Sequence, residues 1–355
     1  MKAWVSGLGS WHPSTVRRND AWPPEFRAAA RAGDRTFNDI PPPLGDAAAL
    51  AERYLELEAI DPFLGARERR VAADGITAAD AEYAAARAAL EDAGVRADQI
   101  DAVISYTTVL DRILPPTAGL VAHRLGATRA VAFGTDAGCS TLITQLMMAA
   151  GMVEAGLARH VLLTQSHLIL RAVPLLHPAT PGLGDAATAC VVGPRGRWRI
   201  VTLHAQTHGE FYDAVAWVRN DDAEDEAPWW KGGGDYRLGS KNRPQAKQLM
   251  RDTVQYGAQT LREAATKAKL GVEQLTHLFS VQPRGWIPGA IAQHLGLPIE
   301  AALTTYEKYA HLGACGPIVN WQTADRAGTL KPASRLALYA QGAGFTRGAA
   351  ILEHF

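Results

Sequence analysis

The chain has few cysteines and no excess of charge, and these shortages exclude several classes of protein. Three cysteines in 355 residues do not suit an oxidised disulfide framework and favour a reducing, cytoplasmic setting. Because 36 basic side chains balance 36 acidic ones, bulk attraction to nucleic acid or to a membrane surface is not expected. No run approaches the roughly 18 apolar residues of a spanning helix, and the apolar stretch before Gly7 is too short to predict a signal peptide.

Hydrophobic residues make up 47% of the chain, enough for a large core or for two domain-sized halves. Short β-branched runs alternate with longer alanine-rich stretches, which predicts an α/β protein. In the first half we expect helices at 78–93, 117–125 and 140–155, and strands at 100–106, 129–133, 160–166 and 186–192.

The second half repeats this order of elements. We expect strands at 198–204, 278–281, 335–341 and 349–353, and helices at 244–269, 288–295 and 311–324. The repetition predicts two similarly built halves, 1–195 and 196–355, with an inserted loop at about 205–241. Within it, the acidic stretch 221–234 contains two tryptophans and three glycines and predicts a surface loop or lid.

The segment 134–142 carries a candidate nucleophile, because it joins a predicted strand to an apolar helix and contains Cys139. Unpaired N–H groups and the positive end of the helix dipole favour thiolate over thiol there. The alternative is that this cysteine is a small buried hydrophobe. Cys190, between Ala189 and Val191, fits that alternative, and Cys315 fits either.

A cysteine nucleophile needs a base and donors for the oxyanion. His311 lies in a stretch of small residues that lets backbone approach closely, although a helix-start histidine without a catalytic role fits equally. The turn 342–348 can present backbone N–H groups, or it is a plain hairpin connection. No zinc-ligand spacing, Walker loop or complete dinucleotide fingerprint occurs in the sequence.

Taken in order, the motifs of the whole chain resemble the β-ketoacyl-[acyl-carrier-protein] synthase III family. They are Gly7-x-Gly9-Ser10-x-x-Pro13, Gly65-Ala66-Arg67-Glu68-Arg69-Arg70, Ala88-Ala89-Leu90-x-Asp92-Ala93-Gly94, Asp136-Ala137-Gly138-Cys139, Gly184-Asp185-Ala186-Ala187 and Gly342-Ala343-Gly344-Phe345-Thr346. The resemblance implies an α/β thiolase fold with a five-layered α-β-α-β-α core, and a homodimer. It implies no permanently bound cofactor, with acyl-CoA or acyl-phosphopantetheine as substrate.

The resemblance assigns the nucleophile to Cys139 and the oxyanion hole to the N–H groups of Cys139 and Ala343. The other two catalytic positions depart from the family pattern. Val281 stands where the family has its histidine, with Gln282 beside it, and His311 stands where the family has asparagine. The placement of His311 resembles a branch of the family that moves acyl groups onto oxygen or nitrogen acceptors, or between carriers, in polyketide and other natural-product pathways.

Simple acyl transfer is therefore the function that we expect. Condensation needs two donors on the malonyl thioester carbonyl, and losing one donor costs about 3 kcal/mol. A single imidazole at an acyl-cysteine is enough to activate an acceptor, and we expect His311 to serve both steps. Two alternatives stay open: a condensing enzyme that uses Gln282 with His311, and a subunit that shapes the pocket of a homologous partner.

The resemblance also bears on how the donor docks. Ala59 stands where the family has the tryptophan that stacks on the adenine of coenzyme A. The segment matching the family's cross-dimer contact to the partner's acyl pocket places Leu114 or Pro115 at that contact. Trp217, Trp229 and Trp230 line an acceptor channel or lie on an exposed lid. A set of basic residues is expected to receive an acidic carrier protein. The alternative is that these residues only form a solvated helix face. They are Lys241, Arg243, Lys247, Arg251 and Arg284.

Overall fold

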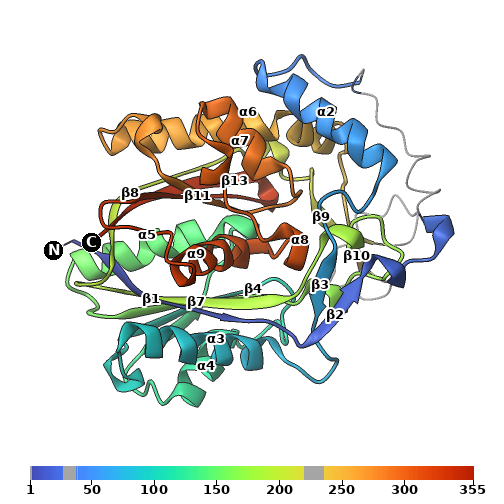
Figure 1. Cartoon of the computed structure of the whole chain (residues 1–355). Coiled ribbons are helices and arrows are strands. Elements are labelled where there is room, and N and C mark those ends of the chain that lie inside the picture. The colour runs from blue at the N-terminus through green and yellow to red at the C-terminus, as the bar shows by residue number, and fades with distance from the viewer. Residues whose placement is uncertain (1, 27–36, 38, 220–235) are drawn as a thin grey trace.

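The computed structural model describes residues 2–26, 37, 39–219 and 236–355, and they form five stacked layers (Figure 1). Helices α3 (Ala78–Ala93) and α4 (Thr117–Leu125) form one outer layer, and α6 (Arg243–Lys267) with α7 (Ile287–Leu295) forms the other. Between them, two layers of strands enclose α5 (Thr141–Glu154) and α9 (Gly316–Arg326). This is the predicted α-β-α-β-α arrangement.

The strands form one hydrogen-bonded order, β11-β12-β13-β8-β1-β7-β6-β4-β5. One layer holds β1 (Trp4–Trp11), β4 (Ala102–Thr107), β5 (Val131–Gly134), β6 (Val161–His167) and β7 (Ala186–Gly193). The other holds β8 (Trp198–Thr207), β11 (His277–Ser280), β12 (Arg335–Gly342) and β13 (Thr346–His354). The layers meet where Val5 of β1 pairs with Trp198 of β8. The boundary at residue 195 stays a prediction.

Several smaller elements lie outside the layers. They include the pair β2 (Thr15–Arg18) and β3 (Glu68–Val71), and the hairpin β9 (Ala216–Arg219) and β10 (Tyr236–Gly239). Helix α2 (Ala47–Ile60) packs against α6 and α7, and the short α8 (Tyr306–Tyr309) precedes His311. Short 3₁₀ turns connect many of the elements, among them Gly138–Ser140, Gly313–Cys315 and Ala343–Phe345.

Capping residues and glycines in the sequence explain where several of the predicted helices begin and end. The predicted helices 78–93 and 117–125 are confirmed residue for residue. A capping box between Thr77 and Asp80 starts α3, and Gly94, with φ of 62°, ends it. Close packing against this helix explains Gly9, because a Cβ there would overlap the backbone of Ala85.

Two predictions for the second half need correction. The helix predicted at 311–324 begins only at Gly316, because the backbone from His311 to Gly313 turns to pair with a loop from the first half. The segment predicted as an irregular loop at about 205–241 contains the end of β8 and the β9–β10 hairpin. Its acidic part, 221–234, with Trp229 and Trp230, lies outside the described residues.

Beneath the first layer of strands, the carboxyl group of Glu82 is fully buried on α3. It accepts hydrogen bonds from Thr107 (2.9 Å), Ser166 (2.7 Å) and Thr164 (2.6 Å). Burial raises the pKa of Glu82 from 4.5 to about 7 in spite of these donors. The folded state therefore binds this proton more tightly than the unfolded state, and stability falls as the pH rises from 4.5 to 7.

The substitution Glu82→Gln removes this cost, because an amide keeps the hydrogen bonds without a buried charge. We expect the gain in unfolding free energy relative to the native chain to be about 2 kcal/mol larger at pH 8 than at pH 5. Urea unfolding at both pH values measures it, and Glu91→Gln on the exposed side of α3 is the matched control. A gain that does not change with pH would contradict the assignment.

Candidate active site

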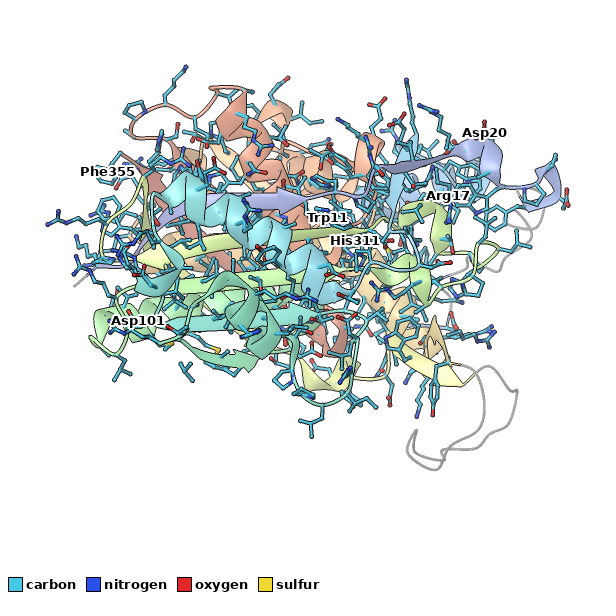
Figure 2. All side chains as sticks on the ribbon, turned by 90° about the horizontal axis from the view of Figure 1, so that it is seen from below. Trp11, Arg17, Asp20, Asp101, His311 and Phe355 are labelled. Carbon is cyan, nitrogen blue, oxygen red and sulfur yellow. The ribbon has the colours of Figure 1, made fainter. Side chains whose placement is uncertain are left out.

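The predicted juxtaposition of Cys139 and His311 is confirmed. The Sγ atom of Cys139 lies 3.5 Å from Nε2 of His311, although the two residues are 172 positions apart in the chain. Cys139 sits in the turn Gly138–Ser140 between β5 and α5, and His311 follows α8. Viewed from below, His311 lies near Trp11, far from Asp101 and Phe355 (Figure 2). Since Asp101 precedes β4, the site lies beyond the carboxyl ends of β4 and β1.

The turn that carries Cys139 packs directly against the turn that carries Ala343. A Cβ on Gly138 would lie 2.8 Å from the amide nitrogen of Ala343, and a Cβ on Gly342 would lie 2.8 Å from that of Cys139. Only glycine permits this approach, and Gly138 also has a positive φ of 57°. The two amides predicted for an oxyanion hole, those of Cys139 and Ala343, therefore lie in two turns that pack against each other.

The loop 182–184 fixes the backbone of His311. The N–H of His311 donates to the carbonyl of Gly182 (2.8 Å), and the carbonyl of His311 accepts from the N–H of Gly184 (3.0 Å). The preceding Ala310 has φ 55° and ψ −151°, close to a region that is otherwise populated by glycine. The chain therefore holds a strained residue next to the imidazole, which indicates that the ring position is enforced by its surroundings.

Burial disfavours a charge on either group of the pair. Burial, with a smaller contribution from Asp136, raises the pKa of the Cys139 thiol to about 12. Burial also holds the pKa of His311 well below its usual value, and His167 and Arg284 lower it further. The thiol meets solvent only through the cavity at which it lies, so desolvation outweighs the favourable helix terminus. This burial opposes the thiolate that the sequence predicts at the helix terminus and favours a thiol beside a neutral imidazole.

A second histidine, which the sequence analysis missed, lies beside this pair. His167 ends β6, is buried, and donates from Nδ1 to the carbonyl of Gly184 (2.9 Å). Its ring makes an edge contact with that of His311, with centroids 5.5 Å apart. Burial lowers the pKa of His167 to about 4. Its position at the carboxyl end of a buried strand was the available signal, because ligands bind at such strand ends.

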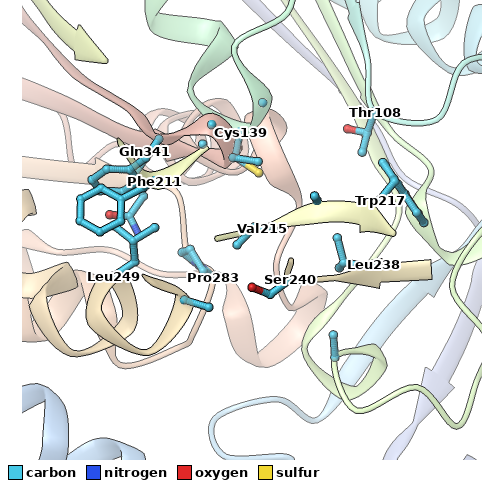
Figure 3. A pocket seen from close by; sticks show the side chains of 18 of the residues that line it. Thr108, Cys139, Phe211, Val215, Trp217, Leu238, Ser240, Leu249, Pro283 and Gln341 are labelled. Atoms are coloured by element: carbon cyan, nitrogen blue, oxygen red, sulfur yellow. The ribbon is translucent and has the colours of Figure 1, made fainter. Parts of the chain in front are cut away.

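The two histidines and Cys139 lie at one end of a cavity of about 1120 Å³. Figure 3 shows Phe211 and Leu249 on one side of it and Trp217 and Leu238 of the β9–β10 hairpin on the other. Its charged lining residues are Asp136, Asp213, Lys241 and Arg284. The cavity is mainly apolar, with the reactive groups at one end, which suits a chain-like or ring-like apolar substrate.

Only the backbone of Gln282 contacts the site, where it acts on His311 and raises the pKa of that imidazole, whereas its side chain is engaged elsewhere. Its Nε2 donates to the carbonyl of Ala310 (3.0 Å), and its Oε1 accepts from Thr304 (2.8 Å) and Asn320 (3.2 Å). It is fully buried and does not line the cavity. The prediction of Gln282 as a catalytic group is therefore wrong, because these bonds engage both ends of its amide. Val281 is also fully buried, in the core between the sheets.

The predicted docking residues do not form one surface. Lys241 and Arg243 are exposed, and Lys241 lines the cavity. Lys247 pairs with Asp39 (3.1 Å), and Arg284, which lines the cavity, pairs with Glu58 (3.2 Å).

The prediction for Arg251 is wrong. Its guanidinium is buried, pairs with Asp252 (2.9 Å) and donates to the carbonyl of Pro41 (2.7 Å). A carrier protein cannot reach a side chain that is enclosed in this way.

The remaining predicted positions lie apart from the reactive pair. Leu114 is 80% exposed, and neither it nor Pro115 lines the cavity. Ala59 lies in α2. Trp217 lines the cavity from the β9–β10 hairpin, so the structure favours the channel interpretation for this tryptophan.

Comparisons with known proteins point in one direction. The family model described as 3-oxoacyl-[acyl-carrier-protein] synthase III matches residues 133–209, and the model of its C-terminal part matches residues 265–354. The β-ketoacyl-[acyl-carrier-protein] synthase III of Rhizorhabdus wittichii is 30% identical over 82% of this chain and 88% of its own length.

Solved structures agree in fold. The synthase III of Thermus thermophilus superposes with a TM-score of 0.78 at 25% identity, covering 99% of each chain. The priming β-ketosynthase of the R1128 polyketide pathway gives 0.79 at 24% identity, covering 99% of this chain and 96% of its own. No helix among the described residues is long and apolar enough to cross a membrane.

The raised pKa of Cys139 predicts how this thiol reacts with iodoacetamide. Between pH 7 and 10 we expect its alkylation rate to rise about tenfold per pH unit without a plateau, because only the thiolate reacts. Peptide mass spectrometry measures the rate, and N-acetylcysteine, which levels off near its ordinary pKa, is the control. Cys190 and Cys315 are fully buried and should stay unmodified. A plateau for Cys139 below pH 9 would show a thiolate in the resting site.

Proposed function

The chain belongs to the β-ketoacyl-[acyl-carrier-protein] synthase III family, and within this family we propose that it is an acyltransferase that loads an acyl group on Cys139 and passes it to a nucleophilic acceptor. The observation that carries the proposal is the contact of 3.5 Å between the Cys139 sulfur and the His311 imidazole at the end of an apolar cavity. The donor is an acyl thioester of coenzyme A or of a carrier protein.

In the first step, the Cys139 sulfur attacks the carbonyl carbon of the thioester while its proton moves to Nε2 of His311. A neutral base beside a neutral thiol supports this concerted transfer, because no isolated buried charge forms before the attack. The negative charge develops on the carbonyl oxygen, where the amides of Cys139 and Ala343 are placed to receive it. The bond to the donor sulfur then breaks, and the leaving thiol takes the proton from His311.

In the second step, the acceptor attacks the acyl-cysteine carbonyl, gives its proton to an imidazole base, and Cys139 regains a proton. Transfer is favoured over condensation because Val281 offers no hydrogen-bond donor and the amide of Gln282 is engaged elsewhere. The donors that decarboxylation needs on a malonyl carbonyl are therefore missing at these two positions.

The surroundings of the cavity support a carrier-bound or coenzyme-bound donor. Lys241 and Arg243 are exposed basic residues at the start of α6, and Lys241 also lines the cavity. They would attract a phosphopantetheine arm or an acidic carrier surface. The apolar walls suit a natural-product or polyketide intermediate as acceptor.

Intact-protein mass spectrometry after exposure to a panel of acyl thioesters tests the proposal. We expect a single acyl adduct on Cys139, absent from Cys139→Ala, and no release of carbon dioxide from malonyl thioester in step with product. Cys190→Ala, in the core, is the matched control and should still be acylated. An adduct on another residue would contradict the proposed nucleophile, and carbon dioxide released with product would favour condensation.

We further propose that the protein is a homodimer that associates through the edge of its first strand layer. Strand β5 is the last in the sheet order, and Val131 on it is 54% exposed. The neighbouring loop exposes Leu110 (51%), Ile113 (70%) and Leu114 (80%), and its Pro116 lies beside Gly134 of β5. Together they form an apolar surface at an unpaired strand edge, which is typical of an interface.

Burying a charge in this interface should separate the subunits. We expect Leu114→Asp to run as a monomer in size-exclusion chromatography with light scattering, at micromolar concentrations where the native chain is a dimer. Ile299→Asp is the matched control, because Ile299 is 59% exposed on the turn after α7. A monomeric native chain, or a dimeric Leu114→Asp variant, would contradict this interface.

A further inference from the structure

His167 is a buried imidazole that lines the reactive end of the cavity and that the first acylation step does not use. Its Nδ1 donates to the carbonyl of Gly184, which fixes the tautomer of the neutral ring. Nε2 therefore carries the lone pair, and none of the described residues forms a hydrogen bond with it. A neutral imidazole with a fixed tautomer therefore lines the same cavity as Cys139.

The fold holds this ring against the turn that carries His311. Gly313, with φ of 54°, makes room for it, because a Cβ on Gly313 would lie 2.9 Å from Nε2 of His167. The rings of His167 and His311 meet edge to face at 5.5 Å. The nearby His167 lowers the pKa of His311, so a positive charge on both rings at once is disfavoured.

On the basis of the proposed function, we propose that His167 is a second catalytic residue: the general base that takes the proton of the acceptor in the second step. His311 is already committed to the sulfur at 3.5 Å, so its Nε2 faces the leaving atom of that step. A base for the acceptor must approach from another side of the acyl group, and His167 supplies one from β6. His311 thereby serves the proton of the Cys139 sulfur, and His167 serves the proton of the acceptor.

The step balances without any further reagent. Nε2 of His167 takes the proton of an alcohol or amine acceptor while the acceptor atom bonds to the acyl carbon. The bond between that carbon and the Cys139 sulfur breaks, and the sulfur leaves as a thiolate. The proton then passes from His167 to the sulfur, directly or through the imidazole of His311, so that both rings and the thiol end neutral.

The variant His167→Asn tests this role, because its amide nitrogen takes the place of Nδ1 and can still donate to Gly184, whereas the lone pair of Nε2 is lost. The matched control is His160→Asn, since His160 directly precedes the other end of β6. Each protein is acylated with hexanoyl-N-acetylcysteamine, freed of donor, and mixed with ethanol or with hydroxylamine. Loss of the hexanoyl mass is followed by mass spectrometry.

Ethanol must lose a proton as it attacks, whereas hydroxylamine attacks near neutral pH without a base. For His167→Asn we expect acylation of Cys139 within about threefold of the native rate, and transfer to ethanol slowed by about 10²- to 10³-fold. Transfer to hydroxylamine should be unchanged, which shows that the acyl-enzyme is correctly folded. His160→Asn should match the native protein in both reactions.

Other outcomes overturn the inference in different ways. Equal transfer to ethanol by the native protein and His167→Asn refutes the role of His167 and leaves the acyltransferase intact. Equal slowing of ethanol and hydroxylamine shows a structural role. A native protein that takes no acyl group on Cys139 refutes the proposed function itself. If His167→Asn does not fold, His167→Gln serves instead, because its amide also lacks a base at the Nε2 position.

Discussion

The contact between the Cys139 sulfur and the His311 imidazole is the interaction on which the site depends. It joins two segments 172 residues apart, and the backbone around it is built to bring them together. Gly138 and Gly342 let two turns touch at Cys139, and the loop 182–184 holds the backbone of His311 by hydrogen bonds. The middle helices and the sheets that enclose them supply the rigid frame for these turns.

Burial gives this contact its chemical character. In water a thiol titrates near pH 9.0 and an imidazole near pH 6.5, but here desolvation raises the pKa of Cys139 and lowers that of His311. In the proposed mechanism, charge develops only as the acyl carbonyl oxygen reaches the amides of Cys139 and Ala343. The site is thereby arranged for charge that forms during the reaction, as electrostatic preorganisation requires.

The sequence predicted a large part of the fold, because the patterns behind it are local. Alanine-rich stretches with a cap and a terminal glycine gave helices with the expected bounds, as in α3. The helix expected at 311–324 started late, since long-range hydrogen bonds to Gly182 and Gly184 hold the first residues in a turn. The periodicity of a segment does not show which residues of the other half of the chain form hydrogen bonds with it.

The same distinction applies to the site. The sequence by itself determined the α/β class, the order of the elements, and Cys139 and His311 as the candidate reactive residues, because motif spacing and the departure at Val281 can be read along the chain. Only the tertiary structure showed that burial raises the pKa of Cys139, that the side chains of Gln282 and Arg251 are engaged in internal hydrogen bonds, and that His167 lies beside the Cys139–His311 pair. These properties depend on burial and on hydrogen-bond partners, and the folded chain assembles both from residues that are distant in sequence.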